Sequence, residues 1–312
     1  MRSKHQAGFL ILMAAALCTS PIASLSAADA NKRVALVVGN SSYQYVSRLT
    51  NPVNDATDVA AKLKSLQFDV LLATDADRAR MVALLQEFKQ RVTREHTALF
   101  FYAGHGVTVN KESFLLPVDV RAVLKLDEQG QLRADAVDSE LVSMASVLSP
   151  LEQARVGVAF LDACRTTGDG LGLRVVSLTG QRAVPVLRGT TSIEIKPSPH
   201  SAGVFRAYAT QLDNAASDGA GRNSPFTKAL LRHIGTQGIS IQELMIRVRK
   251  SVMAETENKQ VPWEEAALNE SFYFVPSSPS SKKSASEPSA KGNPPSRTNL
   301  PPNLGGGVGA GL

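Results

Sequence analysis

The stretch VGVAFLDACRTTG, residues 156–168, changes character abruptly near its middle. Its first six residues are small or apolar, and the segment DACR (162–165) that follows is polar and reactive. A short apolar run bounded by polar residues is typical of a buried strand that ends at a loop. Cys164 is one of two cysteines in the chain, and the other, Cys18, lies close to the N-terminus. We therefore expect a thiol at the end of a buried strand.

Apolar runs and amphipathic stretches alternate on both sides of this strand. Strands are expected at 32–40, 68–74, 97–106, 156–164, 203–210 and 270–276, and helices at 51–67, 76–92, 139–148, 224–234 and 240–255. The helix over 51–67 has Asn51 as a candidate cap and Pro52 at its first position. The alternation predicts an α/β fold with a mainly parallel sheet covered by helices on both faces. Residues 165–202 show no clear periodicity, and such a long irregular segment is usually functional or disordered.

The two ends of the chain differ from the part between them. Residues 1–28 have a basic start, an apolar stretch at 9–17 and small residues beyond it, which is typical of a secretory signal peptide. The apolar stretch is too short to span a bilayer, although a membrane anchor that stays attached is the alternative. Residues 276–312 are rich in Ser, Pro, Lys, Asn and Gly, which predicts a disordered tail. We expect an exported protein, periplasmic or secreted, with a folded domain over 31–275.

The distribution of charge argues against a nucleic-acid partner. The formal charge of the chain is +6, of which +1 falls in residues 1–30 and +3 in residues 276–312. The residues between them keep only +2, with interspersed signs. A nearly neutral domain of this kind has a solvated surface rather than a phosphate-binding stripe. We therefore expect no nucleic-acid partner, and no membrane contact beyond the signal segment.

Two of the expected strands end in residues that can carry chemistry. One ends in Gly104-His105-Gly106 and the other in the segment that contains Cys164. Because the carboxyl ends of parallel strands meet at one edge of a sheet, His105 and Cys164 are expected to lie close together. A thiol with the reference pKa of about 8.5 is mostly protonated at neutral pH, and a histidine within hydrogen-bond reach can act as its base. The backbone N–H groups of Gly106 and Cys164 could then bind an oxyanion.

Each of these residues also has a structural interpretation. A lone cysteine is often a small buried apolar residue, and a histidine in a glycine-flanked turn is often structural. Their joint position at the ends of two strands favours catalysis. A metal site is not expected, because the five histidines are scattered and no CxxC or HxxxH spacing occurs.

Six stretches together carry a specific resemblance to a known family. They are FFYAGHG (100–106), FLDACR (160–165), ALVVGNSSY (35–43), LTNPVNDATDVAAKL (49–63), YATQLDNAASDGAGRNSPFTKALL (208–231) and VPWEEAALNESFYF (261–274). Over residues 32–275 the chain resembles the caspase-like superfamily of cysteine peptidases, especially bacterial metacaspase-type members. The resemblance implies a caspase-like three-layer sandwich, with about six mostly parallel strands between helices. It also implies that His105 and Cys164 are the catalytic dyad and that the N–H groups of Gly106 and Cys164 form the oxyanion hole.

The same resemblance implies that Asp55 and Asp162 line the primary specificity pocket. Two carboxylates in a cleft favour an Arg or Lys side chain, which predicts cleavage after basic residues. Considered alone, Asp55 is equally an early-helix carboxylate stabilised by the helix dipole, and Asp162 a partner for Arg165. Arg48 lies near the place where caspases have a pocket arginine, so cleavage after Asp is the alternative. Ala103 departs from several metacaspases, which have a pocket serine there.

In this family, the segment that follows the nucleophile is often mobile or processed during activation. Here that segment is 165–202. The resemblance therefore suggests self-cleavage at one of four basic residues, which are Arg174, Arg182, Arg188 and Lys196. An exposed loop with ordinary surface charges is the alternative. Many metacaspases need calcium, but DNAASDGAG (213–221) has too few ligands for an EF-hand loop.

These observations predict a cysteine endopeptidase that forms an acyl-enzyme and cleaves peptides or proteins after Arg or Lys. Two further hypotheses stay open: a non-proteolytic module that binds a partner, and a thiol hydrolase of small amides or esters. The sequence makes no prediction of the oligomeric state.

Overall fold

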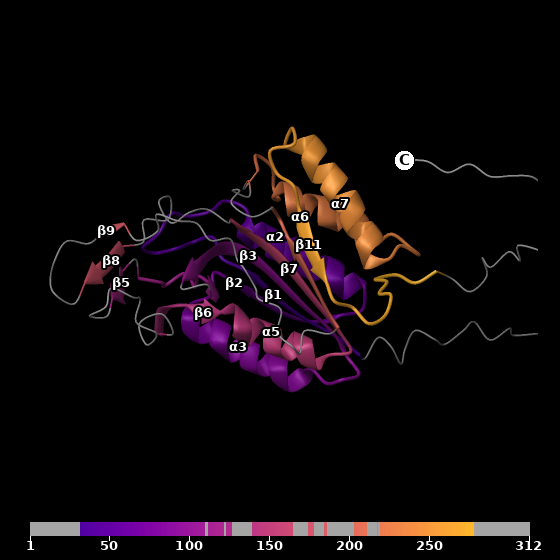
Figure 1. Cartoon of the computed structure of the whole chain (residues 1–312), viewed down its shortest axis with the longest axis horizontal. Coiled ribbons are helices and arrows are strands. Elements are labelled where there is room, and N and C mark those ends of the chain that lie inside the picture. Colours follow the sequence, from indigo (N-terminus) through magenta and orange to yellow (C-terminus); the bar gives the residue numbers. More distant parts are fainter. Residues whose placement is uncertain are drawn as a thin grey trace, which may run out of the picture. The chain divides into compact units, whose positions relative to one another are not determined.

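A computed structural model describes residues 32–109, 112–121, 123–126, 139–164, 174–177, 184–185, 203–210, 217 and 219–277. The predicted signal peptide (1–28) and the predicted tail beyond residue 277 lie outside these residues. Within them, a central sheet lies between two layers of helices (Figure 1). No helix in these ranges is both long and apolar enough to cross a membrane.

The central sheet is mainly parallel, as the sequence predicts. Its main path runs β11-β10-β7-β3-β1-β2. The strands are β1 Arg33–Gly39, β2 Asp69–Thr74, β3 Thr97–Val109, β7 Val156–Cys164, β10 Val204–Tyr208 and β11 Trp263–Ala266. Every neighbouring pair on this path is parallel except β10 and β11, which are antiparallel. The chain therefore has the mostly parallel α/β sandwich that the resemblance to the caspase-like superfamily implies.

Helices cover both faces of this sheet (Figure 1). One face carries α2 Pro52–Ser65, α6 Pro225–His233 and α7 Ile241–Glu255, and the other carries α3 Arg78–Arg91 and α5 Met144–Gln153. Alternation along β3 sends Leu99 and Phe101 into the core under the first group, and Phe100 and Tyr102 into the core under the second. Strands that are buried on both faces read as continuous apolar runs, which is why they are recognisable in the sequence.

Side-chain caps begin four of the helices. Each cap accepts a hydrogen bond from the backbone N–H three residues ahead, and the caps are Asp77, Ser143, Ser224 and Ser240. Asn51 occupies the N-cap position of α2, as predicted, but its side chain makes no capping bond. Asn51 has helical backbone angles, φ −101° and ψ −20°, whereas a capping residue is normally extended. Pro52 does begin α2.

The last strand of the sheet is not the predicted one. No strand forms over 270–276, and β11 occupies the edge instead. Phe272 and Phe274 bury their rings in the core. Their carbonyl oxygens accept hydrogen bonds from the Ile241 N–H and the Arg33 guanidinium, each at 2.9 Å. The backbone polar groups are thus satisfied outside a sheet.

The helix predicted over 139–148 is interrupted in the structure: residues 139–140 are helical, and α5 then runs from Met144 to Gln153. The two residues before it, Val142 and Ser143, form the short strand β6. β6 pairs with β4, Glu112–Leu115, which in turn pairs with the end of β3. Apolar residues ahead of α5 therefore belong to a sheet extension.

Residues 165–202 contain more regular structure than predicted. β8, Arg174–Ser177, and β9, Val184–Pro185, join β5, Val123–Leu126, in a separate three-stranded sheet. The expectation of no regular structure is wrong for these two stretches. Strands of four and two residues are too short to show a periodicity in the sequence.

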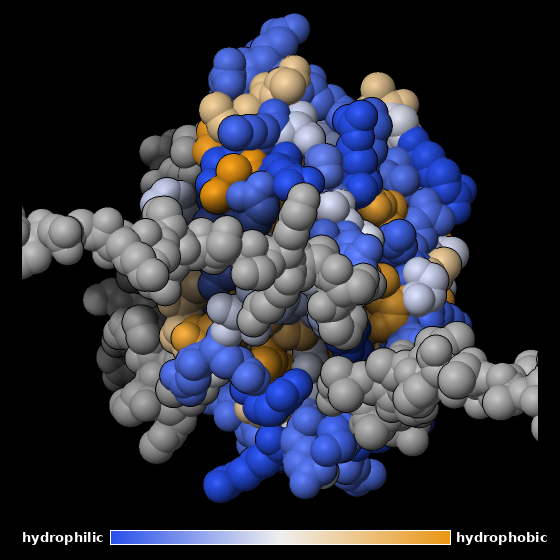
Figure 2. Space-filling view, turned by 90° about the vertical axis from the view of Figure 1, so that its right-hand side faces the viewer, coloured by the Kyte–Doolittle hydropathy of each residue, from blue (hydrophilic) through white to orange (hydrophobic). Residues whose placement is uncertain are grey.

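The surface of the domain seen in Figure 2 is mainly hydrophilic, with small and separate hydrophobic patches. Among the residues that the structure describes, the exposed large hydrophobic ones are Tyr45, Ile246 and Trp263. Single exposed apolar residues are normal on folded domains. They give no reason to assign a binding face.

Candidate active site

His105 is the last residue of β3 that pairs with β7, and Cys164 is the last residue of β7. β3 and β7 are parallel, and His105 is the register partner of Cys164. Adjacent strands are separated by about 4.8 Å, so the two backbones can serve one reaction centre. Only the backbone of Cys164 belongs to the described part of the chain. The structure therefore brings together two backbones that the sequence assigns to one edge of the sheet.

A backbone carbonyl orients the imidazole of His105. Its Nε2 atom lies 2.8 Å from the carbonyl oxygen of Ser47, and the side chain is buried. Because a carbonyl oxygen only accepts, Nε2 carries the hydrogen and Nδ1 is the nitrogen that can take a proton. Val46 precedes Ser47 and belongs to a small apolar cluster with Val107 and Phe114, which fixes the position of this carbonyl.

Two buried tyrosines hold the backbone of His105. The His105 N–H donates to the Tyr43 hydroxyl at 2.8 Å, and the Tyr102 hydroxyl donates to the His105 carbonyl at 2.8 Å. The Tyr43 ring also packs on the imidazole, with ring centroids 4.6 Å apart. Burial, with the neighbouring Tyr43, raises the pKa of Tyr102 well above its usual value. The Tyr102 hydroxyl therefore keeps its proton and acts as a donor.

Gly104 makes room for these two hydroxyls. Its φ of +153° is one that L side chains rarely adopt. A Cβ atom at this position would lie 2.6 Å from the Tyr102 hydroxyl oxygen and 2.7 Å from that of Tyr43. Glycine is thus required immediately before His105 by both conformation and space.

Asp75 anchors the loop that carries Tyr43 and Ser47. One oxygen of its carboxylate accepts the N–H groups of Ser41 and Ser42, each at 2.8 Å. The other oxygen accepts the Ser42 hydroxyl at 2.8 Å. Because Asp75 directly follows β2, the edge strand holds this loop at the end of β1.

Asp55 and Asp162 meet at the beginning of α6. Asp55 lies in the first turn of α2, and Asp162 lies two residues before Cys164 in β7. The Ser224 N–H donates to Asp55 Oδ1 at 3.1 Å, and the Ser224 hydroxyl donates to Asp162 Oδ2. The Thr227 hydroxyl donates to the same oxygen of Asp162 at 2.6 Å. Both carboxylates are buried, and the structure brings them together around one serine.

The other residues predicted near the site lie close to these groups in the sheet or in the loops. Gly106 continues β3 and pairs with β4. Ala103 is buried and is the register partner of Asp162. Arg48 follows Ser47 and is exposed.

Comparison with known proteins identifies the family. Residues 32–273 match the caspase domain family. The chain belongs to the caspase family. It is also similar to the mucosa-associated lymphoid tissue lymphoma translocation protein 1 homolog of Mus musculus, with 27% identity over 142 residues. The corresponding Homo sapiens protein is 26% identical over 142 residues. These matches cover 45% of this chain and 16% of each relative, so the chain matches only a small part of their length.

The predicted self-cleavage sites of this caspase domain are described at one residue only. Arg174 lies in β8, whose backbone pairs with β5 on one side and β9 on the other. A strand paired in this way must leave its sheet before it can enter a peptidase cleft. This pairing disfavours Arg174 as a self-cleavage site. Outside the described residues lie Arg182, Arg188 and Lys196, and also Arg165, the alternative partner of Asp162.

In the described ranges, no three His, Cys, Asp or Glu side chains form a group that could hold a metal ion. The segment weighed for calcium, 213–221, lies mostly outside those ranges.

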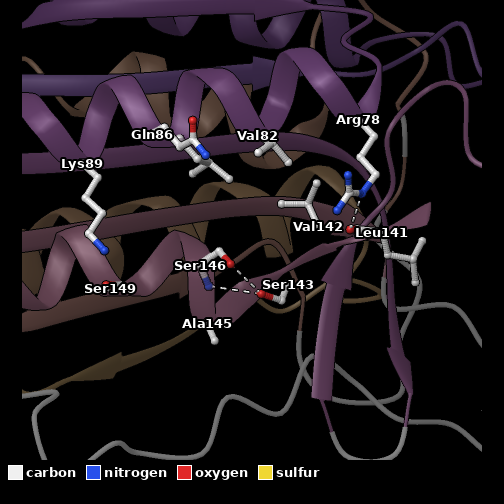
Figure 3. Close-up of a pocket in the computed structure, with 11 residues that line it drawn as sticks. Arg78, Val82, Gln86, Lys89, Leu141, Val142, Ser143, Ala145, Ser146 and Ser149 are labelled. Atoms are coloured by element: carbon white, nitrogen blue, oxygen red, sulfur yellow. Dashed lines mark hydrogen bonds between the residues drawn. The ribbon is translucent and has the colours of Figure 1, made fainter. Parts of the chain in front are cut away.

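A cavity of about 630 Å³ opens between α3 and α5, away from these residues. Figure 3 shows Lys89 extending from α3 toward α5, and Arg78 beside Leu141, whose carbonyl oxygen accepts a hydrogen bond from Arg78 Nε at 3.3 Å. None of the predicted catalytic or pocket residues lines it. The helices that bound it cover the sheet face opposite α2 and α6, so this cavity is separate from the Asp55–Asp162 pair.

Sequence reasoning missed the groups that orient the site of the caspase domain. Ser47 contributes a backbone carbonyl, for which any residue type would serve, so no sequence signal marks it. Ser224 does have a signal, because a serine directly before a proline is typical of a helix start. That signal predicts the cap of α6 but not the contact with Asp162.

Proposed function

We propose that this caspase domain is a cysteine endopeptidase with His105 and Cys164 as its catalytic dyad. The observation that carries the proposal is the register pair of these residues, beside an imidazole whose Nε2 is bound by the Ser47 carbonyl. That bond leaves Nδ1 as the basic nitrogen. A histidine oriented in this way suits proton transfer to and from a neighbouring thiol.

In the proposed reaction, the Cys164 thiol gives its proton to Nδ1 of His105, and the thiolate attacks the carbonyl carbon of the peptide bond. The N–H groups of Gly106 and Cys164 bind the oxyanion that forms. The imidazolium then protonates the leaving amine, the C–N bond breaks, and a thioester joins the substrate to Cys164. Water that gives a proton to Nδ1 hydrolyses this thioester and releases the acid.

The proposed enzyme cleaves after Arg or Lys. Support comes from Asp55 and Asp162, two buried carboxylates that share Ser224 as a hydrogen-bond partner. Paired carboxylates favour a guanidinium or ammonium group through charge-assisted hydrogen bonds. Cleavage after Asp would need a cation in the pocket, and Arg48, the residue considered for that role, is exposed.

Matched fluorogenic peptides that differ only at the residue before the cleaved bond test the proposal. The full chain is expected to cleave the Arg and Lys peptides and to leave the Asp peptide intact, while Cys164→Ala cleaves none. Preference for the Asp peptide contradicts the proposed specificity. No turnover of any peptide favours a binding module, and turnover of small esters without dependence on peptide length favours a different thiol hydrolase.

We also propose that residues 1–28 direct export and that 276–312 form a disordered tail. The support is compositional: a basic start and short apolar stretch at one end, and a low apolar content at the other. N-terminal sequencing of the chain recovered outside the cytoplasm is expected to begin near residue 29. A chain that starts at Met1 in the membrane fraction contradicts removal of the segment and supports a retained anchor.

A further inference from the structure

The first turn of α6 makes contacts that capping alone does not require. Ser224 caps this helix, and its hydroxyl oxygen accepts the Thr227 N–H at 3.0 Å. The same hydroxyl also donates to Asp162. The Ser224 hydroxyl therefore binds the Thr227 N–H and the Asp162 carboxylate at once. The Ser224 backbone N–H binds Asp55.

Thr227 uses its hydroxyl differently from Thr57 and Thr256. The hydroxyls of Thr57 and Thr256 return to the backbone carbonyl four residues earlier, at 2.7 and 2.8 Å, which is the common pattern in helices. The Thr227 hydroxyl instead donates to Asp162 Oδ2 at 2.6 Å, and the residue is fully buried. The cap of α6 needs only the Thr227 backbone N–H, so the side-chain hydroxyl serves the carboxylate.

Two donors on one carboxylate oxygen restrict how that carboxylate can turn. Both Ser224 and Thr227 bind Oδ2 of Asp162, and both sit in the first turn of a helix, where the dipole also favours negative charge. A guanidinium or ammonium group is recognised through directional hydrogen bonds, so a carboxylate of fixed orientation binds it better than a rotating one.

We propose that Ser224 and Thr227 are positioning residues, which hold the Asp162 carboxylate for the basic side chain of the substrate. The inference rests on the proposed function. It adds that basic specificity depends on hydroxyl groups of α6 as well as on the two carboxylates.

The test compares Thr227→Val, which removes the hydroxyl and keeps the shape, with Thr227→Ser, which keeps the hydroxyl. In the full chain, Thr227→Val is expected to raise KM for the Arg peptide about tenfold with little change in kcat, the effect of a lost bond to a charged group. Thr227→Ser is expected to stay within about twofold of wild type, since the donor is kept. The exposed Thr57→Val, the same substitution on α2, serves as the matched control.

Two further measurements distinguish a positioning role of Thr227 from a merely structural one. The Tm of each variant reports folding, and iodoacetamide modification of Cys164, followed by mass spectrometry, reports the thiol itself. The proposal expects Thr227→Val to be folded and to react with iodoacetamide at the wild-type rate. Wild-type KM in a folded Thr227→Val, or an equal loss in Thr227→Ser, overturns it. A wild-type chain that cleaves no peptide overturns the proposed function itself, and the inference with it.

Discussion

His105 on β3 and the end of β7 are neighbours in the sheet, yet they are held by different kinds of group. On β3, His105 is surrounded by neutral partners: two tyrosine hydroxyls and the carbonyl of Ser47. At the end of β7, the carboxylate of Asp162 is held by hydroxyl donors from the start of α6. The neutral groups around His105 suit a side chain that exchanges a proton. The hydroxyl donors around Asp162 suit a negatively charged carboxylate.

The groups that hold His105 and those that hold Asp162 also come from different parts of the fold. The groups around His105 come from the loop after β1 and from β3 itself, whereas those around Asp162 come from α6, beside α2. We infer that changes near His105 affect the chemistry of every substrate. Changes near Asp162 affect the choice of substrate.

The largest expected effect is that of His105→Ala. Loss of the general base is expected to lower kcat/KM about 10³-fold for every peptide that the wild type cleaves. The measurement is initial rates on the matched peptides. His96→Ala, a histidine at the opposite end of β3, is expected to behave like wild type, and an equal loss there would contradict a specific role for His105.

Asp162→Asn is expected to act on specificity instead. Loss of the charge should lower kcat/KM for the Arg and Lys peptides about 100-fold, while the rate at which iodoacetamide modifies Cys164 stays unchanged. Asp69→Asn, an exposed carboxylate on β2, is the matched control. If Asp162→Asn slows iodoacetamide modification as much as peptide cleavage, the two ends do not have separate roles.

Tyr43→Phe is expected to have a smaller effect on all substrates alike. The change removes the hydroxyl that accepts the His105 N–H, and kcat should fall about tenfold, the worth of one buried hydrogen bond. Tyr45→Phe, two residues away and 58% exposed, should change nothing. A Tyr43→Phe effect confined to the Arg peptide would contradict the assignment of Tyr43 to the chemistry.

The smallest effect concerns the ion pair that ties the residues before α6 to α2. Arg222 binds Asp58 through two hydrogen bonds of 2.8 and 2.9 Å, and this contact is the main reason that the pKa of Asp58 lies below its ordinary value of 3.8. A lowered folded-state pKa means that the pair stabilises the fold above that ordinary value. The contribution is lost as the pH falls through the lowered pKa.

Urea unfolding of wild type and Asp58→Asn at several pH values measures this contribution. Because Arg222 is exposed, we expect a difference of about 0.5–1 kcal/mol at pH 7 that shrinks below about pH 4. Glu257→Gln, in the exposed pair with Lys259, should show no difference at either pH. A gap between wild type and Asp58→Asn that widens on acidification contradicts the sign.

The parts of the fold that the sequence predicts are those with a strong local pattern. The central strands and α2, α3, α6 and α7 follow from apolar runs and helical spacing, because burial on a fixed face leaves that record. β11 could not be recognised, since an edge strand of Trp263–Ala266 has no buried face. Phe272 and Phe274 misled the prediction, because deeply buried aromatic rings also occur on irregular backbone.

The candidate site also has parts that the sequence predicts and parts that it does not. The closeness of His105 and Cys164 follows from strand ends alone, because parallel strands share an edge. The Ser47 carbonyl and the contact between Thr227 and Asp162 depend on tertiary placement, which no local spacing records. Sequence thus predicts which strand ends meet, and the loops and α6 decide how each side chain is oriented.

The most direct test of the His105–Cys164 dyad is covalent trapping. A peptide acyloxymethyl ketone that ends in Arg is incubated with the full chain and with His105→Ala, and the intact mass and the modified residue are determined. We predict one adduct per chain, on Cys164, in the wild type, and none in His105→Ala over the same time. An unmodified Cys164 in the wild type, or equal modification of both proteins, would contradict the dyad.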